Sequence, residues 1–158
     1  MRPAPRAWVA GPQEAESVAG LLVAFRDHLG RDRPSDNAFL AGVERLSEDP
    51  ATEFLLALPH DDALPAGVAQ LRFRHSLWTA APDCWLEDLY VAEPARRAGV
   101  ARALVALACD RARERGCRRV ELDVSEANAP ALALYEALGF TAQSKGSGAR
   151  DLVLGREL

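Results

Sequence analysis

The strongest structural signal in this chain is the stretch EDLYVAEPARRAGVA, residues 87–101. Its first part completes an apolar run over residues 84–91 that is typical of a strand, and Pro94 ends that strand. Its second part opens a helix that we predict over residues 98–115, because apolar residues recur there at helical spacing and Gly116 follows as a C-terminal cap. We therefore expect a strand, a short loop and a long helix in direct succession.

The loop between this strand and helix has the composition of an anion site. Gly99 and Ala101 are small, so the backbone can approach a ligand closely, and the unpaired N–H groups of the first helical turn attract negative charge. Arg96, Arg97 and Arg102 add positive charge at the same place. The loop lacks the glycines of a Rossmann fingerprint and the Gly-Lys-(Ser or Thr) of a P-loop. A plain solvated helix start is the alternative, because 18 of the 19 basic residues are arginine and such patterns arise easily by chance.

The hydrophobic periodicity of the remaining chain predicts an α/β domain with a mixed sheet. Before the central stretch we expect strands over residues 7–10, 53–58 and 68–78 and helices over residues 12–29 and 35–48. After it we expect a strand over residues 119–124, a helix over residues 128–138 and two closing strands over residues 140–143 and 151–154.

Composition narrows the class of protein. The chain has 158 residues, of which 49% are hydrophobic and 27% charged, so we expect residues 1–158 to form a single domain. The net charge of −4 excludes a global basic field, so neither nucleic acid nor a membrane is an expected partner. The three cysteines and three histidines show no metal-ligand spacing, and the start of the chain does not read as a signal peptide. We therefore expect a cytoplasmic protein without a metal.

Two motifs give the chain a family resemblance. Arg96, Gly99 and Ala101 match the motif (Gln or Arg)-x-x-Gly-x-(Gly or Ala), which the GNAT superfamily of N-acetyltransferases carries at the loop that binds the acetyl-CoA pyrophosphate. A second stretch, residues 128–140, reads NAPALALYEALGF and also resembles the family. The resemblance implies the GNAT fold, a mixed and mostly antiparallel central sheet of six to seven strands flanked by about four helices.

The resemblance also implies acetyl-CoA as the cosubstrate. In the family the strand before the pyrophosphate loop carries a bulge beside the thioester, so the Leu89 N–H would polarise the thioester carbonyl. Tyr135 would protonate the departing thiolate. The implied cofactor contacts are Leu89, Tyr90, Val91, Arg96, Arg97, Ala98, Gly99, Val100, Ala101, Arg102, Asn128 and Tyr135.

Spacing supports the assignment of the last two residues. Asn128 and Tyr135 are nearly two helical turns apart, so they share one helix face and can both reach an extended cofactor. For Asn128 the alternative is a helix N-cap, and for Tyr135 it is simple packing on the sheet.

Glu87 and Asp88 adjoin the expected position of the thioester. An amine acceptor is mostly protonated at neutral pH and must lose a proton before it attacks, and a carboxylate can remove that proton directly or through water. Glu87 lies two residues before Leu89 and hence on the same strand face, while Asp88 and Tyr90 point the other way unless the bulge rotates them. We therefore expect Glu87 to be the base, with a solvated strand charge as the alternative.

The run EDLYV resembles the diamine and polyamine acetyltransferase branch, in which both acids lie at the acceptor site. We therefore expect direct transfer, in a ternary complex, to a primary amine of a small polyamine-like molecule. The expected acceptor-site residues are Glu87, Asp88, Phe25, His28 and Trp78. Core or rim packing is the alternative for the last three. An acetyl-cysteine route through Cys84 is disfavoured, because a small thiol in an apolar strand is usually inert.

Other acceptors and one other class of function stay open. An aminoglycoside or another amine antibiotic would also need an acidic pocket, and a peptide N-terminus or protein lysine would need an open groove. A non-catalytic acyl-CoA-binding sensor is the alternative outside enzymes, and the presence of both Glu87 and Tyr135 argues against it. Homodimers are common among relatives, so a homodimer is compatible with the resemblance.

Overall fold

The computed structural model describes residues 4–143 and 146–158. The chain divides into two compact units, Met1–Leu122 and Asp123–Leu158, and each is described by itself. The first unit contains the whole sheet and three of the α-helices, while the second contains the helix α4, Ala129–Ala137, and the C-terminal tail. The expectation of a single domain over residues 1–158 stays a prediction.

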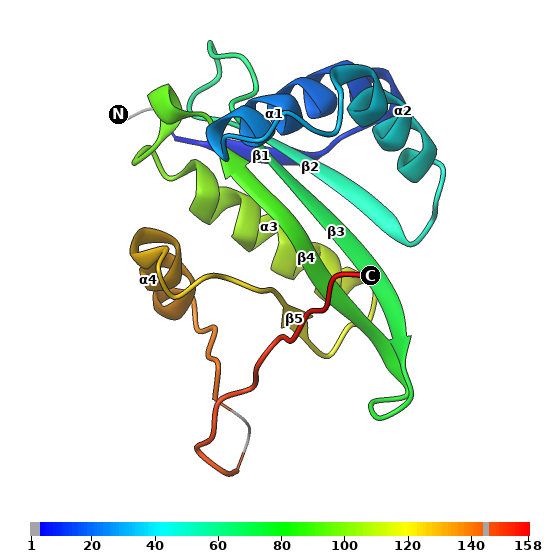
Figure 1. Cartoon of the computed structure of the whole chain (residues 1–158), viewed down its shortest axis with the longest axis vertical. Coiled ribbons are helices and arrows are strands. Elements are labelled where there is room, and N and C mark those ends of the chain that lie inside the picture. Colours follow the sequence, from blue (N-terminus) through cyan, green and yellow to red (C-terminus); the bar gives the residue numbers. More distant parts are fainter. Residues whose placement is uncertain (1–3, 144–145) are drawn as a thin grey trace. The chain divides into compact units, whose positions relative to one another are not determined.

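The sheet of the first unit has five strands in the order β1-β2-β3-β4-β5. Their bounds are β1 Arg6–Val9, β2 Thr52–Leu58, β3 Gly67–Ser76, β4 Ala81–Val91 and β5 Val120–Glu121. The first four strands pair antiparallel, and β4 pairs parallel to β5 through Cys84 and Trp85 alone. The expected mixed and mostly antiparallel sheet is thereby confirmed (Figure 1).

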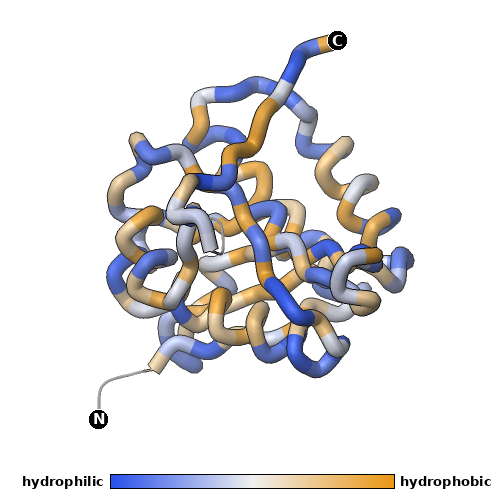
Figure 2. The backbone as a smooth tube through the Cα atoms, turned by 90° about the horizontal axis from the view of Figure 1, so that it is seen from below, coloured by the Kyte–Doolittle hydropathy of each residue, from blue (hydrophilic) through white to orange (hydrophobic). Residues whose placement is uncertain are grey.

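The expectation of six to seven strands is wrong, since the described residues contain five. The strand expected over residues 119–124 shrinks to β5, and the two expected closing strands make only the isolated bridge between Gln143 and Arg150. An apolar pattern favours extended backbone, but a strand also needs a partner for its hydrogen bonds. The hydrophobic tail residues, orange before the C-terminus in Figure 2, lie exposed, with Leu152 at 70% and Leu154 at 87%.

Four α-helices and two short 3-10 turns are present among the described residues, as about four were expected. In the first unit they are the turn η1 Pro12–Glu14, α1 Ala15–His28, α2 Asp36–Ser47, the turn η2 Glu93–Ala95 and α3 Val100–Glu114. The Ser35 hydroxyl caps α2 by accepting a hydrogen bond from the Ala38 N–H. No helix in the described parts of the chain is long and apolar enough to cross a membrane.

The helices of the first unit cover both faces of the sheet (Figure 1). On one face α1 and α2 enclose a core that includes Val18, Leu22, Val68 and Tyr90. On the other face α3 packs so closely that a Cβ placed on Gly67 would lie 2.6 Å from a Val100 methyl group. The sheet is therefore buried on both sides. The strand β4, which carries several of the expected site residues, runs between the layer of α1 and α2 and the layer of α3.

Candidate functional site

A bulge interrupts β4 at the residue expected to be the base. Asp88 lies opposite Gln70, but Leu86 lies opposite Leu71, so Glu87 is the additional residue on β4. The bulge that the resemblance implies is thus present. It leaves the Glu87 side chain exposed to solvent.

The bulge sets which side chains share a face of the sheet. Beyond it, Asp88 and Tyr90 alternate with Leu89, and Tyr90 lies opposite Val68 in the core beneath α1 and α2. Leu89 therefore points to the α3 face, opposite to Asp88. The acid nearest the α1 layer is Asp88, and Glu87 is the acid at the kink of the strand.

Two of the expected acceptor residues gather around Tyr90. The Phe25 ring stacks on the Tyr90 ring with centroids 5.2 Å apart, and the His28 ring lies 6.0 Å from it. The structure therefore brings the end of α1 to the same face as Asp88. It does not bring Trp78 there, because Trp78 is 99% exposed at the turn between β3 and β4. About eight strand residues, or roughly 25 Å, separate that turn from Leu89 along β4.

The backbone of β4 presents hydrogen-bonding groups on its edge away from β3. The Ala92 N–H donates to the Ala66 carbonyl over 2.8 Å, which makes this opposed pair a hydrogen-bonded one. Because bonded and non-bonded pairs alternate in antiparallel strands, Leu89 and Val91 turn their N–H and C=O groups away from β3. At that edge β5 pairs only with Cys84 and Trp85. The segment from Leu89 to Val91 is thus shaped to pair with an extended ligand.

The loop after β4 ends in an uncapped helix N-terminus. Arg97 and Gly99 both have left-handed backbone, with φ of 62° and 82°, so α3 starts at Val100 rather than near residue 98 as expected. No side chain caps this end, which leaves the first-turn N–H groups available to an anion. A Cβ on Gly99 would lie 3.3 Å from the Pro5 ring, so the limited space at this position also favours glycine.

The three arginines of the loop differ in what they contact. All three arginines are exposed, and Arg97 and Arg102 suit the expected role of supplying charge. The Arg96 Nε instead donates a hydrogen bond of 3.0 Å to the Val91 carbonyl, and its guanidinium lies 5.9 Å from the centre of the Tyr90 ring. Arg96 is therefore attached to the end of β4.

In the second unit, Asn128 and Tyr135 lie at the two ends of α4. The Asn128 side chain accepts a hydrogen bond from the Ala131 N–H over 3.4 Å, so it caps the helix. Tyr135 is buried, and its ring meets the Phe140 ring edge-on with centroids 5.8 Å apart. Burial, and to a smaller extent the Asp123 carboxylate, raise the pKa of the Tyr135 phenol. The phenol therefore stays protonated at neutral pH, as a proton donor must be.

The cysteine chemistry agrees with direct transfer. Cys84 is buried on β4, and burial is the main cause that raises the pKa of its thiol to about 12. A thiol that stays protonated at neutral pH is a poor nucleophile. Over residues 4–143 and 146–158 no three His, Cys, Asp or Glu side chains gather as metal ligands would.

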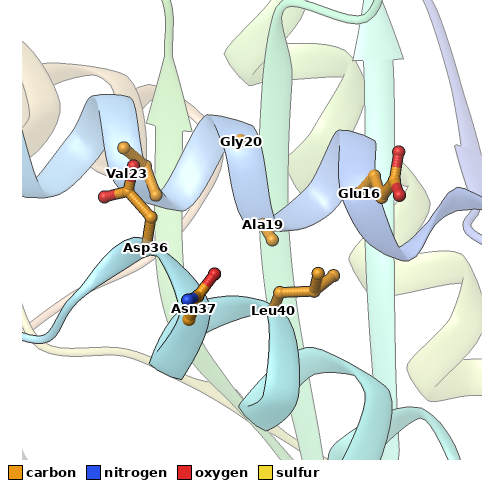
Figure 3. Close-up of a pocket in the computed structure, with 7 residues that line it drawn as sticks. All are labelled: Glu16, Ala19, Gly20, Val23, Asp36, Asn37 and Leu40. Carbon is orange, nitrogen blue, oxygen red and sulfur yellow. The ribbon is translucent and has the colours of Figure 1, made fainter.

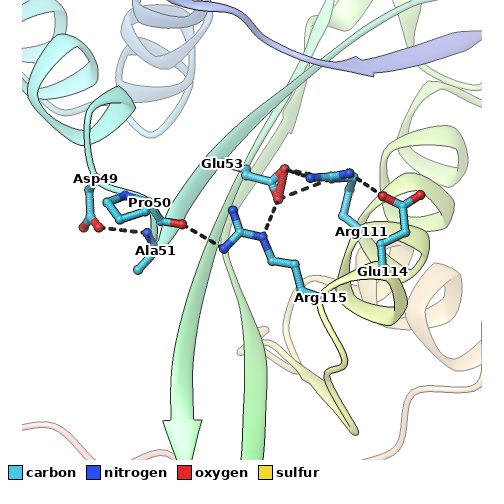
Figure 4. A network of polar contacts seen from close by, with 7 residues as sticks. All are labelled: Asp49, Pro50, Ala51, Glu53, Arg111, Glu114 and Arg115. Atoms are coloured by element: carbon cyan, nitrogen blue, oxygen red, sulfur yellow. Dashed lines mark hydrogen bonds and ion pairs between the residues drawn. The ribbon is translucent and has the colours of Figure 1, made fainter.

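Sequence reasoning missed a buried ionic network at the other end of α3 (Figure 4). The Glu53 side chain on β2 is 6% exposed, and Arg111 and Arg115 pair with it at 2.7 and 3.3 Å. Hydrogen bonding to Glu53 raises the pKa of Arg111. Arg115 also donates to the Pro50 carbonyl over 2.8 Å. In the sequence, the only indication of this network is the acidic residue Glu53 within the apolar strand β2.

A hollow of about 230 Å³ lies between α1 and α2 (Figure 3). Its lining residues are Glu16, Ala19, Gly20, Val23, Asp36, Asn37 and Leu40. None of the expected site residues lines it, and Asp36 is already paired with Arg26 at 2.7 Å. We therefore regard it as a surface groove of the helix pair.

A family model described as the acetyltransferase (GNAT) family matches residues 5–140. The chain belongs to the GNAT acetyltransferase family. A protein described as an acetyltransferase from Arthrobacter sp. FB24 has the same fold, with a TM-score of 0.85 and 31% identity over 96% of this chain and 95% of that chain.

Two curated relatives show the range within this GNAT group. A mycothiol acetyltransferase of Beutenbergia cavernae is 39% identical over 142 residues, which are 83% of this chain and 43% of that protein. An aminoglycoside N(6')-acetyltransferase type 1 of Salmonella typhimurium is 29% identical over 119 residues, which are 73% of this chain and 80% of that protein. The chain thus spans less than half the length of the mycothiol acetyltransferase.

Proposed function

We propose that this GNAT domain transfers an acetyl group from acetyl-CoA to a primary amine of a small molecule, by direct attack in a ternary complex. The observation that carries the proposal is the outward-facing edge of β4 at Leu89 and Val91, which is followed by the uncapped N-terminus of α3. A strand edge suits an extended pantetheine arm, and a helix N-terminus suits a pyrophosphate.

The residues present fit this cosubstrate. Gly99 leaves room where a side chain would meet Pro5, and the first-turn N–H groups with Arg97 and Arg102 would hold the pyrophosphate. The remaining contacts expected from the family are Tyr90, Ala98, Val100, Ala101, Asn128 and Tyr135.

Each step of the transfer has a candidate group on this chain. Acetyl-CoA supplies an acetyl group activated as a thioester. The Leu89 N–H, fixed on the free edge of β4, would stabilise the negative charge that develops on the carbonyl oxygen. Glu87, exposed at the bulge, would take one proton from the protonated amine directly or through water, and the second proton that the nitrogen loses, as the C–N bond forms and the C–S bond breaks, would pass to water. The protonated Tyr135 phenol would donate a proton to the departing sulfur.

For the acceptor we propose a diamine or polyamine-like amine. Glu87 and Asp88 place two carboxylates next to Leu89, and Asp88 shares a sheet face with Tyr90, which Phe25 and His28 cover. Acidic groups beside aromatic rings attract cationic amines. An aminoglycoside is the second candidate, because the Salmonella typhimurium relative is named for that substrate. A homodimer and a cytoplasmic location stay predictions.

A thiol-release assay with acetyl-CoA tests the proposal on a panel of polyamines, diamines, aminoglycosides and peptides. We expect the highest kcat/KM with a polyamine, and a higher value with an aminoglycoside would replace the acceptor class. Tight acetyl-CoA binding without transfer to any amine would favour the sensor.

Two variants test the assigned roles. Tyr135→Phe should lower kcat while the KM for acetyl-CoA stays nearly the same, and unchanged kcat would exclude Tyr135 as the acid. Glu87→Gln should change the pH–rate profile, with Glu44→Gln on the exposed face of α2 as the control. Identical profiles for Glu87→Gln and the unmodified chain would exclude Glu87 as the base.

A further inference from the structure

Arg96 makes a side-chain contact with the end of β4 that the sequence motif does not predict. Its backbone N–H bonds to the Glu93 carbonyl at 3.2 Å, which closes the turn η2. Its side chain then reaches back to β4, where Nε donates to the Val91 carbonyl at 3.0 Å. The side chain thus links the start of the pyrophosphate loop to the last residue of the strand.

The carbonyl that Arg96 binds belongs to the edge that would hold the cosubstrate. Because the pair of Ala66 and Ala92 is hydrogen-bonded, the pair of Gly67 and Val91 is not, and the Val91 carbonyl faces away from β3. A backbone carbonyl that does not pair within the sheet takes its hydrogen bond from a side chain or from water. Arg96 supplies that donor.

The same guanidinium also faces the aromatic layer of the expected acceptor site. It lies 5.9 Å from the centre of the Tyr90 ring, and Phe25 stacks on that ring with centroids 5.2 Å apart. Arg96 therefore contacts Tyr90 and Val91, the two residues that follow the oxyanion donor Leu89.

We propose that Arg96 is a positioning residue, which aligns the backbone of Leu89 and Val91 through its Nε–H, and that the charge for the pyrophosphate comes from Arg97 and Arg102. The proposal rests on the proposed function of acetyl transfer from acetyl-CoA. It differs from the sequence expectation, in which Arg96 is one of three charges at an anion.

The chemistry of the motif supports a donor role over a charge role. The motif accepts Gln or Arg at the position of Arg96. Arginine and glutamine have different charge but share a planar N–H-bearing nitrogen at the ε position, four bonds from Cα. Lysine has the charge of arginine, but a carbon atom occupies its ε position. A requirement for an Nε–H donor therefore predicts that glutamine replaces Arg96 better than lysine does.

The test compares Arg96→Gln, Arg96→Lys and Arg96→Met with two acetyl donors, acetyl-CoA and S-acetyl-pantetheine, which lacks the pyrophosphate. We expect Arg96→Gln to keep kcat/KM within about threefold of the unmodified chain. Arg96→Lys and Arg96→Met should lose about tenfold or more, by the same factor with both donors, since a lost hydrogen bond to a charged donor costs on this order. Arg102→Gln is the matched control, and its loss should be confined to acetyl-CoA.

Calorimetric binding of CoA and of pantetheine gives a second readout that needs no turnover. The same ranking, with Arg96→Gln above Arg96→Lys for both ligands, supports the proposal. A ranking with Arg96→Lys above Arg96→Gln, or a loss limited to CoA, overturns it and makes Arg96 a phosphate contact. Failure of the unmodified chain to transfer acetyl to any amine overturns the proposed function instead, and the binding ranking still decides the role of Arg96.

Discussion

At its N-terminal end α3 begins from Gly99 without a side-chain cap, and Arg97 and Arg102 project into solvent nearby. At its C-terminal end Arg111 and Arg115 enclose the buried Glu53 carboxylate (Figure 4). Both ends are rich in arginine, and at the second end the described residues include an acid, Glu53, with which the arginines pair. The cation at the first end is therefore available to a ligand, while the cation at the second end is used within the fold.

This contrast separates exposed arginines from paired ones in a chain whose basic residues are nearly all arginine. Exposed cations at a helix N-terminus oppose the helix dipole, so they lower stability unless an anion arrives. Cations at the C-terminus of a helix interact favourably with the negative end of its dipole. The Arg115 guanidinium also lies 4.0 Å from the centre of the Phe73 ring, a cation–π contact. The N-terminal end thus lacks the stabilisation that a paired cation gives, and the C-terminal end contributes stability to the sheet.

The largest expected effect comes from breaking the C-terminal end with Glu53→Ala. Removing this carboxylate takes from the half-buried Arg111 and Arg115 the buried acid that they share, so we expect the free energy of unfolding to fall by about 3 kcal/mol. Urea denaturation measures this loss. Glu114→Ala is the control, because Glu114 also pairs with Arg111 but is 62% exposed, and we expect it to cost less than about 1 kcal/mol. An equal decrease in the free energy of unfolding of the two variants would show that the burial of Glu53 does not increase the contribution of its ion pairs to stability.

Alkaline pH tests the buried layer beneath α3 through the Cys84 thiol, whose pKa is raised mainly by burial. Folding raises the pKa of this thiol from 9.0 to about 12, so between these values the unfolded chain ionises while the folded chain keeps its proton. The stability that the protonated Cys84 thiol contributes is therefore fully present below pH 9. This contribution is lost as the pH rises toward 12, at up to about 1.4 kcal/mol per pH unit.

The variant Cys84→Ala isolates this contribution. Its unfolding free energy, measured by urea denaturation at a series of pH values, should fall less steeply above pH 9 than that of the unmodified chain. Parallel curves would show that Cys84 does not titrate differently in the folded and unfolded chain.

The smallest expected effect compares the two left-handed glycines at the ends of α3. Gly99→Ala and Gly116→Ala should both cost about 1 kcal/mol of stability, because φ is 82° and 78° at these positions. Only Gly99→Ala should also weaken acetyl-CoA binding, by roughly fivefold, since the new methyl group would meet Pro5 and shift the loop. Calorimetry checks the affinity, and a weaker affinity in Gly116→Ala would mean that the whole helix, rather than its start, governs binding.

The sequence predicted most of the elements because their signals are local. The apolar spacing of α3, the glycines that bound it and the strand before it all depend on neighbours within a few residues. The failures have a common cause. Residues 140–143 and 151–154 have strand-like patterns, but pairing depends on a partner that the pattern does not contain. Trp78 adjoins the central strand in sequence, yet it lies exposed at the tip of the hairpin, because most of β4, Ala81–Val91, runs between Trp78 and Leu89.

What the sequence by itself determined is the family and the chemistry available to it. The motif of Arg96, Gly99 and Ala101, with the strand before it and the second hallmark around Tyr135, identifies the GNAT acetyltransferase family from local order alone. Only the tertiary structure decided that Glu87 is the bulged residue, that Asp88 shares a face with Tyr90, and that Arg96 binds the Val91 carbonyl. The pairing of Glu53 with Arg111 joins residues 58 positions apart. Strand register and ion pairs between residues so distant in sequence depend on how whole elements pack together. Hydrophobic periodicity, which is a local pattern, does not predict them.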